Sequence, residues 1–247
     1  MVSENVIPRI HPLGIKILPL TAVYIMRKNW WKILSVVLIL YAIIGGLLMP
    51  APDDIGILAK TIRNLHFHVP MWFTMLILLT TSYVYGIKYL NKGNPMHDSM
   101  ASSFVKVAMV FGLMGLATGS FWARFTWGTW WIEDAKLNGA AIGMLIYMAY
   151  YILRNSIDDE VKRGKFSAVY NLFAFPIFIV LIIIYPRMAT TSLHPASGDT
   201  VAFSSLDLDN NLRKVFYLAA IGWILLGVWI ATLRYRITEI NRKDEEI

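Results

Sequence analysis

Three tryptophans lie within residues 126–136, and their type and spacing are the first sign of chemistry in this chain. The segment reads Thr-Trp-Gly-Thr-Trp-Trp-Ile-Glu-Asp-Ala-Lys. Trp127, Trp130 and Trp131 stand at i, i+3 and i+4, so a helix would place all three indoles on one face. Such a face is broad, flat, aromatic and nearly uncharged, and it could bind a flat apolar ligand. The alternative is that the indoles only anchor the chain at a membrane–water interface.

Histidines near the ends of apolar runs add a second kind of chemistry. His66 and His68 precede one apolar run, and His194 follows another. Imidazole is a good ligand for haem iron, and two histidines from separate segments could bind it from opposite sides. The tryptophan face could then hold the porphyrin edge. The alternative is that these histidines are simply solvated.

The composition shows what kind of protein must position these residues. The chain has 247 residues, of which 57% are hydrophobic and 16% charged, whereas soluble domains have about 25% charged residues. The chain is therefore expected to be a membrane protein. It has no cysteine, which excludes disulfides, thiolate metal sites, a thiol nucleophile and covalent c-type haem attachment within the chain.

Six apolar segments approach the roughly twenty residues that a helix needs to cross a bilayer core of about 30 Å. They predict an all-α fold: a polytopic membrane helix bundle with six transmembrane helices, forming one domain over residues 1–247. The first segment is too long for the apolar region of a cleavable signal peptide. Small residues in the fourth should allow close helix packing, and Pro176 should kink the fifth. The segments are residues 30–49, 69–89, 102–121, 137–153, 166–185 and 215–233.

The distribution of lysine and arginine predicts the orientation of the bundle. Sixteen of these residues fall on the side of the two termini, and seven on the other side. The positive-inside rule then places both termini in the cytoplasm. It also accounts for the net charge of +7, so no nucleic-acid partner is expected. The tryptophan segment, His66, His68 and His194 all fall on the outer side, together with four cations that could contact porphyrin propionates: Arg63, Arg124, Lys136 and Arg187.

Only one of His66 and His68 can face a common site, because residues two apart on a helix point about 200° from each other. His68 precedes Val69 and Pro70. Since proline favours the first turn, the second helix is expected to begin there, with His68 at its mouth. Trp72 would share the His68 face. His194 precedes a proline, Pro195, which restricts it to extended geometry.

The residues from Trp127 to Leu137 resemble the tryptophan-rich WWD motif of haem-handling proteins. The six segments, the chain length and the run His68-Val69-Pro70 before the second segment are similar to the cytochrome c maturation protein C (CcmC) family. The resemblance covers most of the chain. The chain departs from the family pattern at three positions: Glu133 stands where the family usually has tryptophan, Lys136 where it has arginine, and Asn138 where it has threonine.

The resemblance implies a protein of c-type cytochrome biogenesis in the bacterial inner membrane that is not an enzyme. It would hold haem b, non-covalently and transiently, at the periplasmic face and deliver it to a small haem chaperone like CcmE. The implied partners also include an ABC-type complex like CcmA and CcmB and a small protein like CcmD. By resemblance, His68 and His194 are the axial ligands of the haem iron. The outward-facing haem-binding loop, at about residues 122–136, would include Trp127, Gly128, Trp130, Trp131 and Asp134.

Three other functions compete with this one. A haem-independent solute permease would be expected to carry charged groups in mid-membrane, and here the spans are nearly free of them apart from Lys106. A cytochrome c synthetase subunit of the CcsA type usually has more spans and more histidines. A purely structural scaffold would bind no haem.

Overall fold

The computed structural model describes residues 20–48, 59, 61–189, 192, 194 and 210–245, and all regular structure in these ranges is helical. Met49 and Pro195, which figure in the expectations above, lie outside them. Six described stretches are long and apolar enough to cross a membrane: 28–48, 62–92, 95–127, 135–155, 160–188 and 210–242. Each contains the described part of one predicted segment, so the all-α, six-span prediction is confirmed. The elements are α1 (Leu20–Leu48), the 3-10 turn η2 (Ile62–Asn64), α2 (Leu65–Lys92), α3 (Pro95–Trp127), α4 (Ala135–Asn155), α5 (Glu160–Ile179), the π-helical η3 (Val180–Ile184), α6 (Tyr185–Met188) and α7 (Asn210–Glu245).

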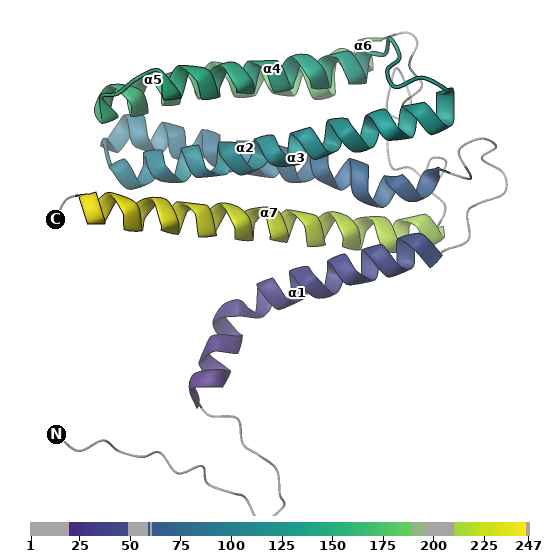
Figure 1. The fold of residues 1–247 in the computed structure, drawn as a ribbon, viewed down its shortest axis with the longest axis horizontal. Coiled ribbons are helices and arrows are strands. Elements are labelled where there is room, and N and C mark those ends of the chain that lie inside the picture. The colour runs from purple at the N-terminus through teal and green to yellow at the C-terminus, as the bar shows by residue number, and fades with distance from the viewer. Residues whose placement is uncertain are drawn as a thin grey trace, which may run out of the picture.

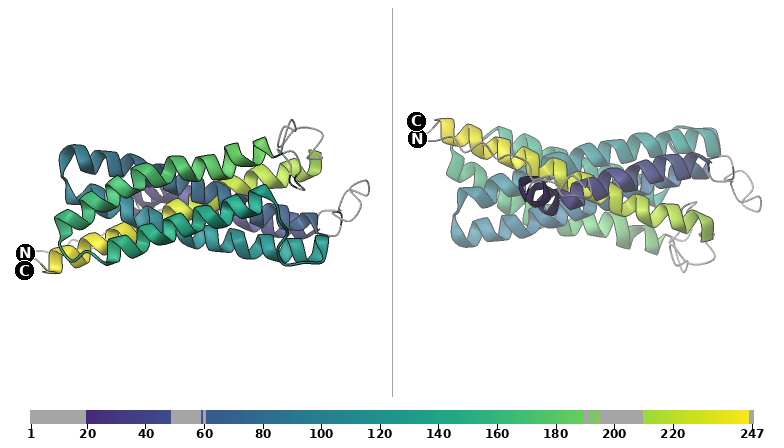
Figure 2. Two further views of the ribbon diagram at one scale, coloured as in Figure 1. Left: turned by 90° about the horizontal axis from the view of Figure 1, so that it is seen from above. Right: turned by 90° about the horizontal axis from the view of Figure 1, so that it is seen from below.

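The long helices run lengthwise through the bundle, so their connections gather at its two ends (Figures 1 and 2). α2 and α3 form the centre, with the α4–α5 pair on one side and α7 on the other. α1 packs mainly on α7, and its first turns diverge from the bundle (Figure 1). Helix connections at one end join α2 to α3 and α4 to α5. The opposite end carries the connection from α3 to α4, and we call it the tryptophan end.

Polar side chains and glycines set the helix boundaries around these connections. Asn94 and Asp159 cap the first turns of α3 and α5 with their side-chain oxygens, as short polar residues do at helix N-termini. Gly93 ends α2 in the left-handed conformation (φ 64°), which favours glycine. Capped ends of this kind close the short α2–α3 and α4–α5 connections.

Three glycines on α3 allow α2 to approach it closely. Gly112, Gly115 and Gly119 lie on one stripe of α3, and a Cβ atom at each would come within 3 Å of an α2 side chain. Small residues drive this kind of packing in membranes, where lipid removes the hydrophobic gain from helix association. Large α2 side chains therefore occupy the space above the glycines, in the pairs Gly112 with Met75, Gly115 with Trp72, and Gly119 with His68.

Several buried polar groups inside the bundle pair with one another across helices. Tyr147 of α4 donates a hydrogen bond to Asn171 of α5 (3.1 Å), and Asn171 donates to Ser82 of α2 (3.0 Å). At the end opposite the tryptophan end, Arg154 of α4 and Asp98 of α3 form a two-bond ion pair at 2.6 and 2.8 Å. Because an unpaired polar group is costly away from water, these contacts fix how the α4–α5 pair sits on α2 and α3.

The predicted start of the second helix is wrong. α2 begins at Leu65, so Pro70 is its sixth residue and not part of its first turn. Tertiary contacts hold the extra turn in place: Leu65 packs with Leu212 and Phe216, and Asn64 Nδ2 donates to the Thr118 carbonyl (2.9 Å). The stabilisation from these tertiary contacts thus exceeds the cost of the backbone hydrogen bond that Pro70 cannot make inside the helix.

Close packing by the small residues of α4 is confirmed. A Cβ atom at Gly139 would collide with the Leu181 backbone carbonyl of η3, and one at Gly143 would lie 2.8 Å from the Phe178 ring. Pro176 lies inside α5, and the hydrogen-bond pattern widens to a π-helix four residues later. Segments of this kind are local departures from regular α-helix geometry.

We expect Gly139→Ala to destabilise the protein by about 1–3 kcal/mol, the usual cost of overpacking. The neighbouring atom is a backbone carbonyl, which cannot rotate away as a side chain can. The measurement is unfolding in mixed micelles at increasing SDS. Gly45→Ala in α1 is the matched control, because the nearest atoms to its Cβ would be side-chain atoms of Val215 at 3.4 Å and Tyr41 at 4.0 Å. Equal midpoints for the two variants would contradict the packing argument.

Candidate functional site

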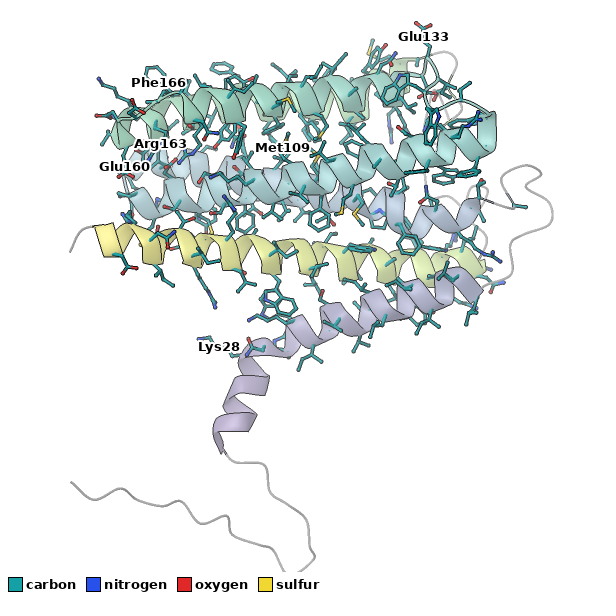
Figure 3. All side chains as sticks on the ribbon, in the orientation of Figure 1. Lys28, Met109, Glu133, Glu160, Arg163 and Phe166 are labelled. Carbon is teal, nitrogen blue, oxygen red and sulfur yellow. The ribbon has the colours of Figure 1, made fainter. Side chains whose placement is uncertain are left out.

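The residues that the sequence singled out meet at the tryptophan end of the bundle. The end of α3, the loop of residues 128–134, the first turns of α2 and α4, and residues 192 and 194 all lie there. Figure 3 labels Glu133 at this end. His68 packs on Trp122 and His194 on Trp127, and both tryptophans belong to the last turns of α3. The two histidines therefore lie at the same end of the bundle, as expected.

His68 is held between α2 and α3. Its Nδ1 atom lies 3.0 Å from the Gly115 carbonyl oxygen and 3.2 Å from the Thr118 hydroxyl. Because a carbonyl only accepts, Nδ1 must carry the proton in that contact. Neutral His68 then has its lone pair on Nε2, which has no hydrogen-bond partner among the described residues and is not sealed from the surface.

His194 is held by the carboxylate of Asp134. His194 Nδ1 lies 3.0 Å from Asp134 Oδ1. Ser192 connects the same two residues, since its hydroxyl donates to Asp134 Oδ2 (2.7 Å) and accepts from the His194 backbone N–H (3.1 Å). Burial by itself would raise the pKa of Asp134, but the hydrogen bonds from His194 and Ser192 outweigh it and keep that pKa well below its usual value. Asp134 is therefore an anion at neutral pH.

Both imidazoles pack edge-to-face against indoles of the same helix. The His68 ring centroid is 5.7 Å from that of Trp122, and the His194 centroid is 5.6 Å from that of Trp127. The two tryptophans are five residues apart on α3, which is about 7.5 Å along a helix axis. The end of α3 thus provides a common support for two histidines that are distant in sequence.

The predicted single face of three indoles is wrong, because α3 ends at Trp127. Gly128 adopts the left-handed conformation (φ 82°) and stops the helix, and Arg124 donates to its carbonyl. Trp130 and Trp131 consequently lie on an irregular loop. The glycine ends the helix in this left-handed conformation, even though the spacing of the tryptophans matches a continuous helix.

The two loop indoles remain open to the surroundings. Trp130 is 55% exposed and packs edge-to-face on Phe121, at 5.3 Å between ring centroids. Trp131 is 41% exposed, and its indole N–H donates to Asn138 Oδ1 (3.2 Å). Asn138, which replaces the threonine implied by the resemblance, thus accepts the hydrogen bond that positions Trp131. Large exposed aromatic rings at one end of a bundle suit contact with an apolar ligand or with the membrane interface.

Glu133 differs from Asp134 in its surroundings. Its side chain is exposed and points away from the bundle (Figure 3). Both residues border an open hollow of about 360 Å³ beside Tyr185 and Met188 of α6, but only 2% of the Asp134 side chain is exposed. At position 133 this chain therefore has an exposed carboxylate in place of the tryptophan that the resemblance implies. Of the two acidic residues, Asp134 is the one that faces a histidine.

Several residues that build the site were not evident from the sequence. Trp122 donates its indole N–H to Thr61 Oγ1 (3.0 Å), and Thr61 in turn contacts the Thr126 hydroxyl (2.9 Å). These bonds attach the chain before α2 to the end of α3. Gly119 provides the space for the His68 ring. Single threonines and glycines in apolar segments carry no sequence signal, and only the pairing of α2 with α3 reveals them.

His66 takes no part in this arrangement. It is fully buried and faces Gly46 of α1, whereas His68 faces α3. The expected divergence of the two side chains is therefore confirmed. Neither ring nitrogen of His66 has a hydrogen-bond partner in the described part of the chain, and both are sealed from the surface.

The arrangement has the chemistry of a two-ligand site. The described residues contain no cluster of three or more histidine, cysteine, aspartate or glutamate side chains that would hold a bare metal ion. They provide instead two imidazoles: Nδ1 of His68 lies within hydrogen-bond distance of the Gly115 carbonyl, and Nδ1 of His194 lies in close contact with the Asp134 carboxylate at 3.0 Å. No described residue binds Nε2 of either ring. A metal-ligating histidine ordinarily has an acceptor of this kind on its other nitrogen. The exposed indoles of Trp130 and Trp131 lie at the same end of the bundle, so the residues present fit the haem that the sequence predicts.

Comparison with known proteins gives a consistent family match. A family model described as Heme exporter protein C matches residues 19–247. The chain is 28% identical to Heme exporter protein C of Bradyrhizobium diazoefficiens over 76% of this chain and 70% of that protein. It is 26% identical to the proteins of the same name from Rhodobacter capsulatus, over 86% of each chain, and Escherichia coli, over 84% of this chain and 81% of that protein.

We expect Gly119→Ala to disturb the position of His68. The new methyl group would lie 2.7 Å from His68 Cε1, so the imidazole must rotate away from its acceptor on Gly115. Binding of haem to purified protein should weaken by about tenfold, equivalent to about 1.4 kcal/mol. Haem titration followed by absorbance measures this. Gly45→Ala again serves as control, and unchanged binding by Gly119→Ala would show that His68 is not held in this way.

We expect His66→Leu to be neutral or stabilising. A buried polar group without a partner costs about 1–3 kcal/mol, and an apolar side chain of similar size removes that cost. The SDS unfolding midpoint should stay equal or rise, and the absorption spectrum with haem should not change. A lower midpoint would indicate that the His66 imidazole makes a favourable contact.

Proposed function

The chain belongs to the heme exporter protein C family, and we propose that it holds haem at the outer face of the membrane and releases it to an acceptor. His68 and His194 bind the iron of the haem as axial ligands. The observation that carries the proposal is that two imidazoles from separate segments pack on the same end of α3, with Nδ1 of His68 beside the Gly115 carbonyl and Nδ1 of His194 beside the Asp134 carboxylate. Haem is the cargo, and its iron offers the two axial positions that a pair of imidazoles can fill.

The loop at about residues 122–136 completes the site. Trp127 packs on His194, so it fixes the ligand, while Trp130 and Trp131 offer exposed rings to the porphyrin. Gly128 ends α3 and directs the chain into the loop. The whole chain, residues 1–247, acts as one six-span domain whose function is ligation and release and not catalysis.

The orientation follows from charge. Lysines and arginines are more numerous at the end opposite the tryptophan end, so that end faces the cytoplasm together with both termini. The bacterial inner membrane and a periplasmic site are consistent with the haem export that the relatives' shared name describes. The cations of the tryptophan end, including Arg187 in the last turn of α6, are then placed to meet the propionates of haem.

Partners follow from the same family membership. The acceptor we propose is a small membrane-anchored chaperone like CcmE, which takes non-covalently held haem b from the exposed indole loop. An ABC-type complex like CcmA and CcmB, with a small protein like CcmD, would contact the membrane-spanning part. A site that is open on one side suits such a transfer, because the acceptor must reach the haem before the two histidines release its iron.

The test is haem binding by the purified wild-type protein and two ligand variants. Wild type should show the absorption spectrum of bis-histidine haem, and the haem should be fully extractable into acidified organic solvent. His68→Ala and His194→Ala should each lower haem affinity at least about tenfold, or about 1.4 kcal/mol, and give a spectrum of single-histidine ligation. The double variant should lose the bis-histidine signal completely.

His66→Ala is the matched control, because it removes a third imidazole two residues from His68 that faces α1 instead. It should keep the wild-type spectrum. Full haem with an unchanged spectrum in the double variant would refute the ligand assignment. Haem-independent solute flux in liposomes would favour the permease instead.

A further inference from the structure

We propose that Asp134 is a positioning residue that acts on haem only through His194, and that it makes the two axial ligands unequal. This inference rests on the proposed function, because it concerns how one of the two histidines is held. The resemblance at the level of sequence counts Asp134 among the residues of the haem-binding loop. The structure assigns it a place behind the histidine and away from the ligand.

The oxygens of Asp134 are committed to protein groups. Oδ1 accepts from the Lys136 backbone N–H (2.8 Å) and faces His194 Nδ1 (3.0 Å), and Oδ2 accepts from the Ser192 hydroxyl (2.7 Å). Only 2% of the Asp134 side chain is exposed, compared with 21% of the His194 side chain. A ligand approaching from outside therefore meets the imidazole and not the carboxylate.

The close contact with the Asp134 carboxylate favours one tautomer of His194. A carboxylate accepts and does not donate, so Nδ1 carries the hydrogen and Nε2 keeps its lone pair. Ser192 restrains the same unit through its bonds to Asp134 Oδ2 and to the His194 backbone. The imidazole is consequently presented in one orientation, with its ligating nitrogen away from Asp134.

His68 is held by a different kind of acceptor. The groups near its Nδ1 are the Gly115 carbonyl and the Thr118 hydroxyl, both neutral. A carboxylate acceptor draws the Nδ1 proton more strongly than a carbonyl does, and it leaves the imidazole richer in electrons. His194 is therefore the stronger donor to iron, and its advantage is greater for ferric than for ferrous haem.

Asp134→Asn tests this directly, because asparagine caps helices as well as aspartate and so keeps the start of α4 while removing the charge. Affinity for ferric haem should fall about 10–100-fold, as second-shell changes at metal-ligating histidines typically cause. Affinity for ferrous haem should fall less. Each tenfold difference between the two losses raises the reduction potential of the bound haem by about 59 mV. Spectroelectrochemistry of the detergent-purified protein measures the shift.

Two controls separate the hydrogen bond from other effects of the change. Asp159→Asn makes the same substitution at the exposed cap of α5, where the carboxylate accepts from Lys162 N–H (2.7 Å) and contacts no histidine among the described residues. It should leave the potential unchanged. Glu133→Gln removes the neighbouring exposed charge, and its shift should be smaller than that of Asp134→Asn. Ser192→Ala, which keeps the carboxylate but removes one restraint, should give an intermediate loss.

The decisive comparison is made in the His194→Ala background. There Asp134→Asn should cause no further change in haem affinity or potential, because the imidazole through which it acts is gone. A further loss in that background would show that Asp134 contacts haem directly. A wild-type reduction potential in Asp134→Asn alone would show that the carboxylate has no influence. Either outcome overturns the inference. If His194→Ala itself leaves the spectrum unchanged, the proposed function fails, and that outcome is distinct from both.

Discussion

The contact between α2 and the glycine stripe of α3 determines where the site can form. Because Gly112, Gly115 and Gly119 have no side chains, the backbone of α3 comes within reach of the large residues on α2. The same approach brings the Gly115 carbonyl to His68 Nδ1. In lipid, such packing and hydrogen bonding replace the hydrophobic effect as the reason for two helices to associate. The histidine is thus oriented by the same contact that holds the bundle together.

The second half of the site depends on one carboxylate that joins distant parts of the chain. Asp134 caps the first turn of α4, ends the tryptophan loop, and holds Ser192 and His194 beside Trp127. The loop and the described residues Ser192 and His194 therefore cannot be positioned independently. His68 packs between two long helices, whereas His194 is held by polar contacts with Asp134 and Ser192, so the two imidazoles are held in different ways.

The sequence predicts the parts of this structure that depend on composition and the lengths of apolar segments, and it fails where tertiary packing decides. Six spans follow from hydropathy, and the opposite directions of His66 and His68 follow from helix geometry. The helical face of tryptophans was wrong because Gly128 ends α3, and the start of α2 was wrong because packing around Leu65 adds a turn before Pro70. The roles of Gly119 and Thr118 could not be predicted, since both depend on which two helices meet.

The contrast between His66 and the other two histidines shows what a site for transfer requires. His66 is sealed, and its nitrogens have no partner in the described part of the chain, so it offers tight surroundings but no access. His68 and His194 each have Nδ1 beside an acceptor and Nε2 available, and the exposed indoles of Trp130 and Trp131 lie at the same end of the bundle. Securing Nδ1 reduces the freedom that ligation would otherwise have to remove, while the exposed rings leave a side from which an acceptor can approach. Contacts at Nδ1 thus support binding strength, while Nε2 and the exposed rings provide access, so a gain in one does not require a loss of the other.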